Sequence, residues 1–123
     1  MPTSNYRSRF EEKVALDLKG SGVVFSYEEK SIKFVQPQKN RRYTPDFFLP
    51  NGVILEVKGK LTVADRKKHE WIKQQHPELD IRFVFQNPNN KLYKGSKTSY
   101  ADWAQKVGIT WCKGPKIPKQ WTN

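Results

Sequence analysis

This chain of 123 residues is long enough for one domain with a buried core, and its single cysteine, Cys112, excludes an internal disulfide or a zinc cluster built on cysteines. The hydrophobic fraction is 36% and falls in helix-like and strand-like runs, which excludes extensive disorder, and no run approaches membrane-spanning length. Lys and Arg total 23 against 12 Asp and Glu, a formal net charge of +11.

This excess of positive charge predicts an anionic partner, most simply a nucleic acid. The alternative is a solvated basic surface with no such partner. The N-terminal segment Met1–Arg7 lacks the hydrophobic core of a signal peptide, and a lone cysteine suits a reducing cytoplasm. We therefore expect a single domain, residues 1–123, that acts on nucleic acid away from any membrane.

The first predicted element is a helix over Ser8–Leu18. Apolar side chains recur every four residues from Phe10 to Leu18 and form a stripe along one face. Ser8, followed three residues later by Glu11, has the form of a capping box, and two glycines end the helix.

Two extended segments and a connector follow this helix. Val23–Glu28 is rich in branched and aromatic residues, which predicts a strand, and Ile32–Val35 predicts a second short one. Residues 36–42 are polar and basic, and Pro37 lacks the donor that a central ladder needs. We expect them to form an exposed connector.

A hairpin is predicted where Tyr43–Leu49 and Val53–Lys58 are joined by a Pro-Asn-Gly turn. If the two strands pair directly across that turn, Asp46 lies opposite Glu56. Because side chains alternate along a strand, Lys58 shares the face of Glu56. Two carboxylates and one ammonium group are therefore expected to converge.

The second half of the chain predicts two more helices, over Thr62–Gln75 and from Ser99 to Gly108. Ile81–Phe85 reads as a largely buried strand, and Ile109–Cys112 as a final one. A proline-containing tail is expected to pack through a tryptophan near the end of the chain. This order of elements predicts an α/β fold in which helices flank a mixed central sheet.

The trio of Asp46, Glu56 and Lys58 has the composition of a divalent-metal site with a cation beside it. One or two carboxylates hold Mg²⁺ and leave positions for water and phosphate oxygens, which phosphodiester hydrolysis requires. The backbone carbonyl of Val57 could add a neutral ligand, and Lys58 could orient water or stabilise charge on phosphorus. The alternative is a pair of cross-strand charges on an exposed hairpin.

Three further ionisable residues are candidates for the same site. The pattern around Glu11 slightly favours a helix cap over a third catalytic carboxylate. His69 and His76 lack a matching carboxylate pattern, so we predict that both are surface residues.

Basic residues outside the trio are candidates for contacts with phosphates. The charged run Asp65–His69 is either a solvated helix face or a phosphate-positioning element. Trp71, Trp103 and Trp111 lie in apolar patterns, which favours the core over base stacking. The candidates in this run, in the connector and in a late loop are Arg66, Lys67, Lys68, Lys39, Arg41, Arg42, Lys91, Lys94 and Lys97.

The segment Tyr43–Phe47, followed by Leu49–Gly52 and by Glu56 and Lys58, resembles the PD-(D/E)xK nuclease signature. More narrowly, the chain resembles the phage endonuclease I family, the Holliday-junction resolvases of podophages. The likeness extends over roughly residues 8–121, and its further stretches are Asp65–His69, Gln75–Arg82, Lys91–Ser96 and Thr98–Tyr100.

The resemblance implies a restriction-endonuclease-like core and a DNA recombination enzyme. Members of this family cleave four-way and other branched DNA by paired nicks, with Mg²⁺ or, as a substitute, Mn²⁺. They are homodimers that exchange structural elements between chains. The resemblance further implies the cytoplasm of the phage-infected host cell and no small-molecule cofactor beyond the metal.

The resemblance also assigns roles to residues. Glu11 takes the place of the family's helix glutamate. The resemblance therefore implies a functional role for Glu11 in place of the helix cap that its local pattern slightly favours. Asp46, Glu56 and Lys58 take the other three catalytic places, with Asp46, Glu56, Glu11 and the Val57 carbonyl as metal ligands. Residues 36–42 take the place of the bridge between two catalytic halves.

The chain departs from this pattern on its first strand. A related protein has a glutamate where this chain has Ser26, and Glu28, two residues further on, would share the same face. Two other functions stay open: a mismatch- or restriction-type nuclease on the same core, or a non-catalytic basic module that binds DNA or RNA and whose carboxylates only pair with lysines.

Overall fold

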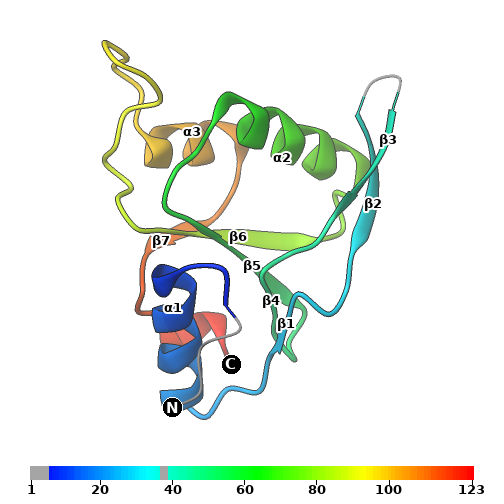
Figure 1. The fold of residues 1–123 in the computed structure, drawn as a ribbon, viewed down its shortest axis with the longest axis vertical. Coiled ribbons are helices and arrows are strands. Elements are labelled where there is room, and N and C mark those ends of the chain that lie inside the picture. Colours follow the sequence, from blue (N-terminus) through cyan, green and yellow to red (C-terminus); the bar gives the residue numbers. More distant parts are fainter. Residues whose placement is uncertain (1–5, 37–38) are drawn as a thin grey trace.

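A mixed five-stranded sheet with helices on both faces forms the centre of the protein in a computed structural model that describes residues 6–36 and 39–123 (Figure 1). A separate two-stranded hairpin projects beside this sheet. The elements are α1 (Arg9–Gly20), β1 (Ser26–Tyr27), β2 (Ile32–Gln36), β3 (Lys39–Tyr43), β4 (Phe47–Phe48), β5 (Val53–Lys58), α2 (Val63–Gln75), β6 (Asp80–Phe85), α3 (Tyr100–Val107), β7 (Trp111–Lys113) and a 3₁₀ turn, η1 (Lys119–Trp121).

The strands of the large sheet lie in the order β1-β4-β5-β6-β7. β5 pairs antiparallel with β4 and parallel with β6, and β6 pairs parallel with β7. The predicted fold class, a mixed sheet flanked by helices, is confirmed. In the part of the chain that the structure describes, no helix is long and apolar enough to cross a membrane.

Alternating side chains of β5 and β6 divide the core between the two faces of the sheet. Leu55 and Val84 pack on one face with the apolar stripe of α1 and with Trp121, whose predicted packing is confirmed. Phe83 and Phe85 pack on the other face with α3, where Trp103 is buried. Apolar burial on both faces therefore holds β5 rigid, which matters because β5 carries Glu56 and Lys58.

The helices begin where their capping residues predict. Thr62 and Ser99 each accept a hydrogen bond from the third helical amide, and the aspartate at that position accepts one in return from the backbone amide of the capping residue. At α1 the box is half-formed, because Ser8 accepts from the Glu11 amide while the Glu11 carboxylate accepts from the Arg7 amide. The Glu11 carboxylate therefore bonds the amide one residue before the cap and not the amide of Ser8 itself.

The predicted hairpin register is confirmed. Phe47 pairs with Leu55, and the Leu49 amide donates to the Val53 carbonyl at 2.9 Å, so Asp46 faces Glu56. The first strand of the hairpin is shorter than the predicted Tyr43–Leu49, because Tyr43 belongs to β3 and only β4 continues the ladder. Proline precedes Asp46 and has no amide hydrogen to give to a ladder.

Two predicted boundaries upstream were wrong. The strand expected over Val23–Glu28 shrinks to β1, because its partner β4 offers only Phe47 and Phe48 for pairing and residues 23–25 lie outside the ladder. At the other end, Glu28 adopts a left-handed backbone with φ of 51° that ends the extended run. The expected connector, residues 36–42, is largely a hairpin, because β2 pairs antiparallel with β3 from Ile32↔Tyr43 to Gln36↔Lys39. A polar composition allows such a ribbon at the edge of a fold. Pro37 lies outside the described residues, and the role of 36–42 as a bridge between lobes stays a prediction.

Candidate active site

A cleft of about 580 Å³ opens where α1, the β4–β5 hairpin and the start of α2 meet. It contains all four residues that the resemblance assigns to catalysis, together with cationic side chains from β3 and α2. Its lining consists of Arg7, Glu11, Arg42, Tyr43, Thr44, Asp46, Glu56, Val57, Lys58, Asp65 and Lys68.

Asp46 is the most strongly perturbed carboxyl group of the cleft. It is 5% exposed, and its Oδ2 accepts a hydrogen bond of 2.8 Å from the Val57 amide. Burial, followed by repulsion from Glu56 and Glu11, raises its pKa to about 9, although the Val57 amide and Lys58 oppose that shift. Without a cation beside it, the surroundings of Asp46 therefore favour the protonated form of its carboxyl group. The amide of Val57 is committed to Asp46, and a ligand role for its carbonyl stays a prediction.

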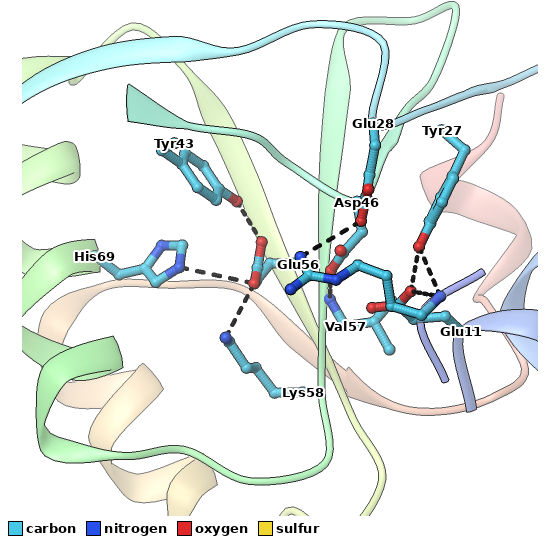
Figure 2. Close-up of polar contacts among 10 residues, drawn as sticks. Glu11, Tyr27, Glu28, Tyr43, Asp46, Glu56, Val57, Lys58 and His69 are labelled. Atoms are coloured by element: carbon cyan, nitrogen blue, oxygen red, sulfur yellow. Dashed lines mark hydrogen bonds and ion pairs between the residues drawn. The ribbon is translucent and has the colours of Figure 1, made fainter. Parts of the chain in front are cut away.

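Both carboxylate oxygens of Glu56 have defined neighbours (Figure 2). Oε1 accepts a hydrogen bond of 2.5 Å from the buried hydroxyl of Tyr43. Oε2 lies 3.2 Å from Lys58 Nζ, which is also 3.3 Å from Asp65 Oδ1. Burial alone would lower the pKa of Lys58, but the carboxylates of Glu56 and Asp65 outweigh it and raise that pKa, so the ammonium stays charged.

Asp65 joins two structural tasks. Its Oδ2 accepts from the Thr62 amide and so caps α2, while its Oδ1 faces Lys58. Burial opposes ionisation of Asp65, but the bonds from Thr62 and the charge of Lys58 lower its pKa. The lysine of the cleft is thus held by the first turn of the neighbouring helix as well as by Glu56.

The prediction that His69 lies on the surface was wrong. His69 is 2% exposed and its ring packs edge-on between Tyr43 and Phe83, with centroids 4.9 and 4.7 Å away. Burial, then the charges of Lys68 and Lys58, hold its pKa well below the usual value, so the ring is neutral. Its Nε2 lies 3.9 Å from Glu56 Oε2 and makes no hydrogen bond within the described residues. The three-residue step from His69 to Ile72 on one helix face was the signal for its burial.

His76 lies at the end of α2, as predicted for a surface residue. Its side chain is part-exposed, and its ring nitrogens contact the Lys33 carbonyl and the Glu78 carboxylate. It does not line the cleft.

Glu28 is a site residue that the nuclease signature does not include, and the sequence suggested it only through its two-residue spacing from Ser26. One oxygen each from Glu11, Glu28 and Asp46 lies within 4.8 Å of the others, and no other three-ligand group of this kind occurs in residues 6–36 and 39–123. Glu11 accepts from the Arg7 amide at 3.1 Å and from the Tyr27 hydroxyl. Asp46 therefore stands between two acidic neighbourhoods, Glu56 on one side and Glu11 with Glu28 on the other (Figure 2).

The candidate phosphate-binding residues separate into two places. Arg42 and Lys68 line the cleft, and an adjoining groove between β3 and α2 is lined by Arg41, Arg42, Lys67 and Lys68. Lys91, Lys94 and Lys97 lie on the long loop before α3, away from the cleft lining, and Arg66 has one buried guanidinium nitrogen that finds no partner in the described chain. The side chain of Lys39 lies outside the described residues.

Removal of the Tyr43 hydroxyl is expected to weaken the site. In Tyr43→Phe, Glu56 Oε1 loses its only described donor in a buried place, which should cost about 1–3 kcal/mol of unfolding free energy. A less constrained Glu56 should also lower affinity for a divalent cation, by about tenfold. Urea unfolding and Mn²⁺ titration measure both effects. Tyr93→Phe, on an exposed side chain, is the matched control, and equal behaviour of the two variants would contradict the prediction.

The mixed sheet, with buried acids and Lys58 on adjoining β segments, places the protein in the class of PD-(D/E)xK nuclease cores. Residues 2–123 match the family model described as Phage endonuclease I. The chain belongs to the phage endonuclease I family. It is 49% identical over 116 residues to Endonuclease I of Escherichia phage T7, which covers 94% of this chain and 77% of that protein. It is 48% identical over 121 residues to Endodeoxyribonuclease 1 of Enterobacteria phage T3, which covers 94% of this chain and 80% of that protein.

Proposed function

We propose that this protein is a metal-dependent DNA endonuclease that resolves four-way and other branched DNA by paired nicks. The observation that carries the proposal is the cleft in which Glu11, Asp46, Glu56 and Lys58 come together beside a basic groove. The names of the two relatives, an endonuclease and an endodeoxyribonuclease, support a DNA substrate.

The donor set of the cleft fits Mg²⁺, with Mn²⁺ as a substitute. The side-chain ligands on offer are carboxylate oxygens, which these hard cations prefer. One buried oxygen of Glu28 makes no hydrogen bond to the residues that the structure describes, and burial raises the pKa of Asp46. Both observations support a shortage of positive charge that a divalent cation would correct. Asp46, Glu56, Glu11 and the Val57 carbonyl would hold the ion. When bound, it would supply Lewis-acid charge at the phosphate and lower the pKa of attacking water.

The protein groups then have separate tasks. Tyr43 fixes one oxygen of Glu56, which leaves the other oriented towards Lys58. Lys58 keeps its proton because two carboxylates face it, so it presents a permanent positive charge to the scissile phosphate and to the water beside it. Burial of Asp46 and Glu56 limits their motion and strengthens these charge interactions.

Selectivity for branched DNA would come from phosphates and shape rather than from base sequence. Arg41, Arg42, Lys67 and Lys68 present four cations along one groove that leads to the cleft, whereas base reading requires side chains directed into a DNA groove. A two-fold homodimer would present two such clefts to symmetric strands of a four-way junction, which suits paired incision. Exchange of elements between the two chains is part of this proposal.

The direct test is a nicking assay on a labelled four-way junction with Mg²⁺, with Mn²⁺ and with a chelator. We expect symmetric nicks near the branch only when a divalent ion is present. Preferred cutting of mismatched or linear duplexes would instead favour a mismatch- or restriction-type nuclease. The absence of strand breakage with either ion at any protein concentration would favour a non-catalytic binding module.

Substitution of the groove lysines is expected to reduce the salt dependence of junction binding. In the double variant Lys67→Ala and Lys68→Ala, the slope of log affinity against log salt should become shallower by about 0.9 for each phosphate that the protein no longer neutralises. Binding titrations at several salt concentrations measure the slope. Lys106→Ala, on the exposed last turn of α3, should keep the wild-type slope. If the salt slope of the double variant equals that of the wild type, the groove does not contact DNA phosphates, which would contradict this part of the proposal.

A further inference from the structure

The buried imidazole of His69 faces the Glu56 carboxylate from the side of α2 (Figure 2). The His69 side chain is 1% exposed, and the rings of Tyr43 and Phe83 pack edge-on against it. Close packing of this kind restricts the ring, so its Nε2 stays directed towards Glu56 Oε2, 3.9 Å away. His69 therefore belongs to the surroundings of Glu56, although it does not line the cleft.

The Nε2 atom of His69 is a buried polar atom that makes no hydrogen bond within residues 6–36 and 39–123. A buried polar group left without a partner costs about 1–3 kcal/mol of stability. Packing alone does not require that cost, because an apolar side chain of similar size would fill the same place without a polar atom. The free nitrogen therefore needs a reason outside packing, and its direction towards a carboxylate supplies one.

Lys58 is the donor that engages Glu56 Oε2 in this structure, with Nζ 3.2 Å away. In the function proposed above, the same ammonium group also serves the scissile phosphate. An ammonium that turns to a phosphate leaves Oε2 without its donor, while Oε1 keeps the Tyr43 hydroxyl. His69 Nε2 lies only about 1 Å beyond the usual N–H···O distance of about 2.9 Å, so a small movement would close the gap.

We propose that His69 is a positioning residue whose Nε2–H group donates a hydrogen bond to Glu56 Oε2 when Lys58 turns from Glu56 to the substrate phosphate. This inference rests on the proposed endonuclease function and adds a residue to it. A carboxylate only accepts hydrogen bonds, so the imidazole carries its hydrogen on Nε2 and keeps it throughout. Because a carboxylate oxygen has two lone pairs, the bond leaves Oε2 able to bind a cation as well.

Nitrogen-edited NMR of the full-length chain, without DNA or metal, tests the contact directly. In Lys58→Ala the competing donor is gone, so the His69 Nε2–H proton should move downfield from its wild-type position as the hydrogen bond forms. Lys60→Ala, on an exposed side chain, should leave this signal unchanged, and His69→Met assigns it. An unmoved signal in Lys58→Ala, or a ring that carries its hydrogen on Nδ1, would overturn the proposal.

Substitution of His69 itself tests its role in nicking. His69→Met keeps apolar contacts and removes the donor, and its single-turnover rate with Mg²⁺ at saturating protein should fall by about tenfold or more. Its junction affinity should stay within a few-fold of the wild type. His69→Gln keeps an N–H donor and should regain most of the rate, and urea unfolding confirms that both variants are folded. A purely structural role would not separate the two rates, so equal rates of His69→Met and wild type, or equal losses in both folded variants, would overturn the proposal.

The outcome for His69 can be separated from the outcome for the proposed function. If the wild type nicks junctions and His69→Met nicks them at the same rate, only the role of His69 fails. If the wild type breaks no DNA with Mg²⁺ or Mn²⁺, the proposed endonuclease function fails, and the NMR comparison still decides whether His69 is a donor for Glu56.

Discussion

Replacement of Glu56 by Gln, or of Lys58 by Ala, is expected to abolish junction nicking while junction binding survives. Glu56→Gln removes the negative charge that a cation and Lys58 both require, and Lys58→Ala removes the only ammonium group within 3.3 Å of the Glu56 and Asp65 carboxylates in the described cleft. Loss of one group that stabilises transition-state charge typically costs about 10²–10³ in rate, and we expect at least that loss here. Single-turnover nicking of a labelled junction measures the rate.

Binding and cutting separate in this prediction because they use different residues. The groove cations Arg41, Lys67 and Lys68 are untouched by either substitution. A gel-shift titration in a chelator should therefore give junction affinities within a few-fold of the wild type. Lys60→Ala, two residues beyond Lys58 and exposed, is the control and should nick normally. Normal nicking by Lys58→Ala would contradict the proposal that this cleft is the catalytic site.

Asp46→Asn is expected to stabilise the metal-free protein at alkaline pH and to abolish nicking. The pKa of Asp46 is raised from 3.8 to about 9, so the folded protein binds this proton more tightly than the unfolded chain does. The contribution of Asp46 to stability is full below about pH 4 and is lost progressively as pH rises towards 9. Asparagine keeps an oxygen for the Val57 amide but has no charge to bury. We expect a gain of several kcal/mol at pH 8 that shrinks as the pH falls and vanishes near pH 4.

Urea unfolding in a chelator, at fixed protein concentration and at several pH values, measures this difference. Added Mg²⁺ should stabilise the wild type more than Asp46→Asn, because an ion that binds only the folded state raises its stability. Glu29→Gln, which removes an exposed carboxylate, should show little change with pH relative to the wild type. A less stable Asp46→Asn at pH 8 would show that the buried carboxylate is already compensated.

The part of the site that could be predicted is the part set by local chain geometry. The Pro-Asn-Gly turn fixes which residues of β4 and β5 pair, and this register places Asp46 across from Glu56. Thr62 and Ser99 begin their helices through bonds that span three residues. In each case the deciding partner is near in sequence, so the pattern of residues contains the information.

The features that the sequence predicted wrongly, or left without a role, depend on partners far along the chain. Glu28 reaches the site because its amide meets the Asp46 carbonyl, 18 positions away, in a left-handed conformation that nothing in its neighbours requires. His69 is buried because Tyr43 and Phe83 close around it from two different strands. The β2–β3 hairpin forms where Phe34 and Tyr43 pack on Ile72 of α2. The polar composition of residues 36–42 does not predict this contact.

The shared carboxylate of Asp65 has a mechanical consequence. One of its oxygens caps α2 and the other holds Lys58, so the helix that carries Lys67 and Lys68 is fastened to the strand end that carries the ammonium. A DNA duplex that displaced α2 on binding would also displace Lys58. A duplex that bound without moving α2 would leave Lys58 in its position. For the function proposed above, we therefore expect Asp65 to couple the position of α2 on DNA to the position of Lys58.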